Sequence, residues 1–145
     1  MKTIYNKISE RLSALKDIPL LLMRLILAYG FYTPAIMKLK NMESIGEWYG
    51  SLGIPLPLFS AYLSGVTEIS GIVLLVLGLG TRIASIPLII MMVVAIITVH
   101  IGNGFEAGDN GFEIPIYYII MLFTLIIYGS GRISIDNLIK NRVNK

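Results

Sequence analysis

The sequence predicts an all-α membrane protein: a four-transmembrane-helix antiparallel bundle with an N-terminal interfacial helix and a short amphipathic helix in the first outer loop. Of its 145 residues, 55% are hydrophobic and only 14% are charged, whereas soluble domains average about 25% charged residues. Four apolar segments approach the roughly 20 residues that a bilayer-spanning helix needs. We therefore expect one membrane domain and no separate soluble catalytic domain.

Composition excludes several classes of function. The chain has no cysteine, which excludes disulfides, thiol redox catalysis, iron–sulfur ligation and covalent c-type haem. The formal charge of +3 comes from basic residues that flank the apolar segments, where they set membrane orientation, so nucleic acid is not an expected partner. No motif identifies a catalytic residue, and a redox role would need a borrowed cofactor because none is intrinsic.

The chain divides into three expected parts. Its first residues place apolar side chains on one helical face and basic ones on or beside the other, which suits a helix lying in the headgroup region. The parts are an amphipathic cytoplasmic-side segment over 1–17, a single transmembrane domain over 18–128 and a cytoplasmic basic tail over 129–145.

The first spanning helix is predicted over residues 18–37, because Asp17 and Pro19 are helix-start signals. It carries Arg24 in its interior and Lys38 at its exit. Steps of three and four residues connect these two cations, so both lie on one helical face. We expect that face to meet the second helix.

The connection between residues 39 and 58 contains a short amphipathic helix. Trp48 and Tyr49 suit a membrane interface, and Gly53 followed by Pro55 ends the helix.

The second spanning helix, residues 58–79, carries one carboxylate, Glu68, in its middle. At helical spacing Glu68 falls on a stripe of small residues, which let helices approach closely in a membrane. An ionisable residue there costs about 2.5–3.5 kcal/mol on insertion scales unless it is paired or hydrated. Glu68 therefore faces protein, where it either lines a functional cavity or only locks helices together. The stripe consists of Ala61, Ser64, Gly65, Glu68, Gly71, Leu75 and Gly78.

A three-residue turn leads into the third helix, residues 83–99, which forces the second and third helices to be antiparallel. The third helix ends at His100. The fourth helix is predicted over 114–128, with Glu113 just before it and Pro115 in its first turn.

Basic residues predict the orientation. Of the twelve Lys and Arg, nine lie in the N-terminal segment, the turn between the second and third helices, and the C-terminal tail, whereas the other loops hold only Lys38 and Lys40. Positively charged loops stay in the cytoplasm. We therefore expect a multi-pass protein of a bacterial-type cytoplasmic (inner) membrane with both termini cytoplasmic.

Four ionisable groups of mixed sign lie toward the outer side in this topology. Lys38, His100 and Glu113 are at outer helix ends, and Glu68 leans that way because helical side chains tilt toward the N-terminus of their own helix. A pocket lined by these four could bind a polar head group such as a quinone carbonyl, or relay protons. The alternative is that the helix-end groups are ordinary interface residues. No metal site is expected, since one His and no Cys suit zinc and copper poorly.

Arg24 and Glu68 are a candidate for intramembrane charge pairing, although their predicted depths differ. They lie about 7 Å and about 16 Å above the inner ends of their helices, and their side chains lean apart. Three arrangements stay open: a direct pair, a bridge through water or a third group, and an Arg24 that reaches the cytoplasmic interface.

Several short motifs occur in a characteristic order. They are Arg24-Leu25, Gly30, Lys38-Leu39, Gly53-Ile54-Pro55, Glu68 with Gly71, Gly78-Leu79-Gly80-Thr81-Arg82, His100 and Gly129-Ser130-Gly131-Arg132-Ile133-Ser134-Ile135-Asp136. This set, which covers about residues 18–137, resembles the DoxX family of small four-helix membrane proteins. The chain departs from the family pattern at Pro34 and Ala35, where a Gly is common, and at Ser130, where a Pro is frequent.

The resemblance implies a membrane partner role, because the family is named after a subunit associated with thiosulfate:quinone oxidoreductase. We interpret the chain as a membrane subunit or accessory of a redox system, with quinone as the candidate cofactor and a membrane oxidoreductase or a second copy of the chain as the candidate partner. It is not expected to be an enzyme in isolation. The alternatives are a non-enzymatic scaffold or assembly factor, and a small-molecule or ion carrier, for which four helices leave little room.

Overall fold

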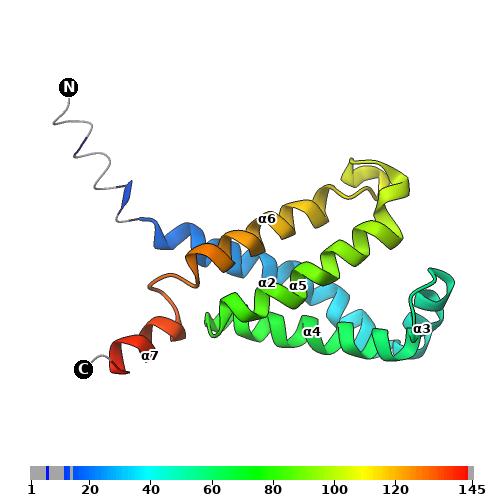
Figure 1. Ribbon diagram of the computed structural model, residues 1–145, viewed down its shortest axis with the longest axis horizontal. Helices are drawn as coiled ribbons and strands as arrows, with labels where there is room; N and C mark the ends of the chain where they lie inside the picture. The colour runs from blue at the N-terminus through cyan, green and yellow to red at the C-terminus, as the bar shows by residue number, and fades with distance from the viewer. Residues whose placement is uncertain (1–5, 7–11, 14, 144–145) are drawn as a thin grey trace.

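The computed structural model describes residues 6, 12–13 and 15–143, and the regular structure in this part of the chain is all helical (Figure 1). Most of the predicted interfacial helix over 1–17 lies outside the described residues. Three helices are long and apolar enough to cross a membrane, and a fourth apolar helix is shorter. The three are Asp17–Lys40, Pro57–Leu77 and Thr81–Asn103, and the shorter one is Glu113–Tyr128.

The helices follow the predicted order. They are α2 (Asp17–Lys40), α3 (Met42–Ser51), α4 (Pro57–Leu77), α5 (Thr81–Ala95), α6 (Glu113–Tyr128) and α7 (Ile135–Val143). The first spanning helix extends past the predicted end at residue 37, because the Asn41 N–H still bonds the carbonyls of Met37 and Lys38. The third changes to a π-helical turn, Ile96–His100, before its predicted end at residue 99.

Four long helices lie side by side. α2 packs along α4, α5 packs along α6, and α4 packs against α5 through the short turn between them. Figure 1 shows the first residues of α2, the α4–α5 turn and α7 at one end of the bundle, and α3 with the segment after α5 at the other end. α3 packs on α4, where Gly46 lies against Leu58.

The predicted faces of the helices are confirmed. The buried residues of α4 are Ala61, Ser64, Gly65, Glu68, Gly71 and Leu75. On α2, the face with Arg24, Ala28, Phe31, Ala35 and Lys38 is buried as well. The bulky residues on the other faces of α4, including Leu63, Val66 and Val73, are exposed, as expected for a helix whose outer surface meets lipid.

The apolar core lies at the centre of the bundle. Phe31 of α2 meets Tyr118 of α6 edge to face, with ring centroids 5.4 Å apart. Gly30 permits this contact, because a Cβ there would overlap the Tyr118 hydroxyl. The buried core residues are Leu20, Leu27, Ala28, Phe31, Leu75, Leu88, Leu122 and Leu125.

The chain after α6 folds back onto the bundle. The Asp136 Oδ1 atom accepts a hydrogen bond from the Gly80 N–H at 2.8 Å, and the Asp136 N–H donates to the Gly78 carbonyl at 3.1 Å. The Arg132 N–H donates to Asp17 at 2.8 Å. The segment predicted as a basic tail therefore closes this end of the bundle, through Arg132 ahead of α7 and Asp136 in its first turn.

Candidate functional site

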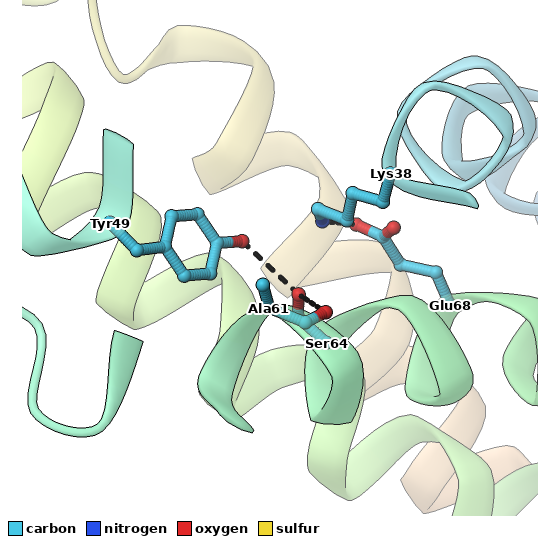
Figure 2. Close-up of polar contacts among 5 residues, drawn as sticks. All are labelled: Lys38, Tyr49, Ala61, Ser64 and Glu68. Carbon is cyan, nitrogen blue, oxygen red and sulfur yellow. Dashed lines mark hydrogen bonds and ion pairs between the residues drawn. The ribbon is translucent and has the colours of Figure 1, made fainter. Parts of the chain in front are cut away.

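A buried ion pair joins α2 to α4. The Lys38 Nζ atom donates to the Glu68 Oε1 atom at 2.5 Å. Lys38 is 8% exposed and Glu68 is 2% exposed. Figure 2 shows the two side chains pointing toward one another from neighbouring helices. The sequence grouped these residues in one polar set, and the structure brings them into direct contact.

The direction of helical side chains explains why these two groups meet. α2 and α4 are antiparallel, and a helical side chain tilts toward the N-terminus of its own helix. Lys38, near the end of α2, therefore leans toward the middle of the bundle, and Glu68, in the middle of α4, leans toward Lys38. The small residues around Glu68 allow α2 to approach closely.

A second polar contact lies one helical turn from Glu68. The Tyr49 hydroxyl of α3 lies 3.1 Å from Ser64 Oγ, and Ser64 Oγ donates to the Ala61 carbonyl at 2.9 Å (Figure 2). The sequence predicts Tyr49 at the membrane interface and Ser64 on the stripe of small residues that carries Glu68, but it does not predict their contact. The amphipathic pattern of α3 located the helix but gave no partner for the hydroxyl.

The ion pair keeps hydrogen-bonding capacity. Glu68 Oε2 is buried and has no hydrogen-bond partner among the described residues. A lysine ammonium has three donors, and Lys38 Nζ makes one hydrogen bond within the described part of the chain. Buried polar groups are normally satisfied. This site can therefore still accept one hydrogen bond at Glu68 and donate others from Lys38.

A direct pair of Arg24 with Glu68, one of the three arrangements that the sequence left open, is not formed, since each has another partner. Arg24 leans the other way along α2, and its Nη2 atom donates to the Ile133 carbonyl at 2.5 Å. Its side chain is fully buried against Gly78, where a Cβ would overlap the guanidinium. This places the cation beside the C-terminal end of α4, where the helix dipole favours positive charge.

His100 and Glu113 bond within their own part of the chain. His100 Nδ1 lies 2.8 Å from the Asn110 carbonyl. The Glu113 carboxylate accepts from the Ala107 N–H and the Tyr117 hydroxyl, each at 2.9 Å. Neither residue makes a hydrogen bond or ion pair with Lys38 or Glu68 in the described part of the chain. The structure therefore brings together two of the four predicted site residues.

Two hollows open at the other end of the bundle, beside the turn between α4 and α5. They have volumes of about 1020 Å³ and about 440 Å³. The smaller one is lined by Arg24, and neither is lined by the four predicted site residues. Among the residues that the structure describes, no three His, Cys, Asp or Glu residues gather as metal ligands.

Comparison with known proteins identifies the family. The sequence model described as DoxX matches residues 19–101. The chain belongs to the DoxX family. A Bacillus subtilis relative named "Putative oxidoreductase CatD" is 33% identical over 122 residues, which cover 83% of this chain and 86% of the relative.

Other DoxX-like relatives carry less specific names. A Haemophilus influenzae protein described as uncharacterized is 30% identical, covering 85% of this chain and 84% of its own. A Mycobacterium tuberculosis protein described as an uncharacterized membrane protein is 31% identical, covering 82% and 80%. No solved structure matches the chain significantly. The family and its relatives identify this chain as a membrane protein.

Proposed function

We propose that this DoxX protein is a membrane subunit or accessory of a redox system, and that the Lys38–Glu68 pair binds the polar head group of a quinone or a similar small molecule. The observation that supports this most is the carboxylate–ammonium pair inside an apolar bundle, with one carboxylate oxygen lacking a partner. An intramembrane ionisable pair is a functional-site candidate by default. The name of the Bacillus subtilis relative agrees with a redox role.

The donors and acceptors of the pair fit both forms of a quinone. A bound quinone would supply two-electron carrier chemistry. Lys38 can donate to a carbonyl oxygen, and Glu68 Oε2 can accept from a hydroxyl. The pair therefore offers a donor to the oxidised head group and an acceptor to the reduced one.

Entry of a head group requires movement of α3. The pair is closed from solvent, and the Met42 side chain packs beside Gly65 on the same face of α4. Tyr49 fastens α3 to Ser64 through one hydrogen bond, a contact worth about 0.5–1.5 kcal/mol. Gly46 of α3 also packs against Leu58 of α4, so entry of a head group would have to loosen this packing as well as the hydrogen bond.

The four apolar helices, in this proposal, cross a bacterial inner membrane as one antiparallel bundle. α6 has 16 residues, a length of about 24 Å, so the bilayer is locally thin beside it or its flanking residues reach the interface. The pair then lies toward the outer leaflet and both termini lie in the cytoplasm, since nine of the eleven loop cations belong in sequence to the N-terminal segment, the turn between α4 and α5, and the C-terminal tail.

Cysteine labelling tests this orientation. Lys2→Cys and Asn144→Cys should be shielded from an impermeant thiol reagent in intact cells, whereas Asn103→Cys should be labelled. The native chain has no cysteine, so each variant reports one position without background. Labelling of Asn144→Cys together with protection of Asn103→Cys would invert the topology.

Purification from native membranes tests the redox role against the scaffold alternative, in which the polar groups only lock helices. A redox subunit should bring lipid-soluble quinone or an oxidoreductase partner with it through mild solubilisation. The measurement is mass spectrometry of the extracted lipids and of the co-purified proteins, compared with an unrelated four-helix membrane protein prepared in parallel. If neither quinone nor an oxidoreductase is recovered in a larger amount than with the unrelated protein, the scaffold alternative is favoured.

A further inference from the structure

The groove of about 1020 Å³ beside the turn between α4 and α5 is lined by both acidic and basic side chains. It lies between the start of α2, the start of α5, the end of α6, the segment that leads into α7 and the first turns of α7. Two carboxylates line it together with four cations, which are Lys16, Arg82, Arg132 and Lys140. We propose that this groove binds the phosphate headgroup of an anionic phospholipid from the leaflet at this end of the bundle.

The charges in the groove favour an anion, because both carboxylates already accept hydrogen bonds from groups of the protein itself. Asp136 accepts from the Gly80 N–H and from the Ser130 hydroxyl. Asp17 accepts from the Arg132 N–H and lies 3.5 Å from the Arg132 guanidinium. Lys16 and Lys140 make no side-chain hydrogen bond or ion pair within the described residues, so their ammonium groups remain available to a ligand.

The apolar rim of the groove favours a lipid over a free phosphate. Ile83 and Tyr128 line the groove and are 76% and 69% exposed, so they can contact acyl chains and the interfacial region beside the headgroup. α7 adds Leu138, Ile139 and Val143, all exposed on a helix that also carries Lys140. A helix with apolar and basic faces lies in the membrane interface.

Basic residues at a cytoplasmic helix end also occur for topology alone, so the test must separate a site from diffuse surface charge. Arg142 provides the matched control, because it lies on α7 two residues from Lys140 and does not line the groove. The variants are the single substitutions Lys16→Gln, Lys140→Gln and Arg142→Gln. Circular dichroism melting in phosphatidylcholine nanodiscs checks that each variant folds like the wild type.

The measurement is the number of phosphatidylglycerol molecules retained per protein in mixed phosphatidylglycerol–phosphatidylcholine membranes, read by native mass spectrometry. Wild type should retain phosphatidylglycerol over phosphatidylcholine. Each groove lysine removed should weaken retention about tenfold, because it takes away a charge-assisted hydrogen bond to the headgroup phosphate, which is worth about 1.5 kcal/mol. Arg142→Gln should change retention less than Lys140→Gln does.

Three outcomes would overturn the proposal. Equal losses in Arg142→Gln and Lys140→Gln would indicate diffuse surface charge, and no preference for phosphatidylglycerol in the wild type would exclude an anion site. Glycerol 3-phosphate added to phosphatidylcholine nanodiscs is the third arm. If it stabilises the protein as much as phosphatidylglycerol does, the groove binds a free phosphate and not a lipid.

Discussion

Lys38→Leu is expected to destabilise the bundle by about 3–5 kcal/mol, the usual cost of breaking a buried ion pair by removing one partner. The substitution leaves Glu68 buried between α2 and α4 with neither oxygen paired. Protonation of Glu68 would relieve part of this cost, but the helix would still carry an unsatisfied polar group. The measurement is unfolding of the purified protein in mild detergent, followed by circular dichroism.

Lys40→Leu is the matched control, because Lys40 ends the same helix, is exposed and makes no ion pair within the described residues. It should change stability by less than 1 kcal/mol, as surface substitutions usually do. The double variant Lys38→Leu/Glu68→Leu should recover most of the lost stability, since well-packed apolar residues often replace a buried pair at no cost. Equal stability of wild type and Lys38→Leu would show that the pair does not hold α2 against α4.

The second large effect is expected at Arg24. Arg24→Leu should destabilise the protein by about 1.5–3 kcal/mol, the contribution of a hydrogen bond to a charged group. It removes the donor to the Ile133 carbonyl and the cation beside the C-terminal end of α4. Arg24→Lys keeps the charge and should restore part of the stability, although lysine lacks the planar fork of arginine.

Proteolysis adds a local readout to the melting of these Arg24 variants. If Arg24 ties the chain after α6 to the bundle, cleavage near Ile133 should become faster in Arg24→Leu while cleavage in the segment after α5 stays unchanged. Arg142→Leu, on the exposed surface of α7, is the control. An unchanged melting curve and unchanged cleavage would mean that the fold-back of the chain does not depend on Arg24.

The faces of the helices could be predicted from the sequence, because small residues at helical spacing carry a strong signal. Glu68 lies on a stripe that only a neighbouring helix can cover, and the structure covers that stripe with α2, α3 and α5. Helical steps of three and four residues place Lys38 on the same face as Arg24. This correctly indicates that both cations are buried.

The hydrogen-bond partners of the polar side chains could not be predicted in the same way. The acceptor of the Arg24 hydrogen bond is the backbone carbonyl of Ile133, and a carbonyl leaves no mark on residue type. The helix ends predicted from the sequence indicate the depth of His100 and Glu113 along the bundle but not their position around it. The structure satisfies each of them within the segment that joins α5 to α6. The Tyr49 hydroxyl contacts Ser64 because α3 folds onto α4. The spacing of apolar residues in α3 does not by itself determine that packing.

The most direct test of the proposed site is the amount of quinone bound per protein after purification in native lipids, compared between wild type and Glu68→Gln. Glutamine keeps the shape of the side chain but removes its charge. Glu113→Gln is the control, since Glu113 bonds within its own segment. We expect Glu68→Gln to fold and to retain about tenfold less quinone in its reduced form, because the hydroxyl of that form would donate a charge-assisted hydrogen bond to the Glu68 carboxylate. A folded Glu68→Gln protein with the full quinone complement, or a wild type with none, would contradict the account.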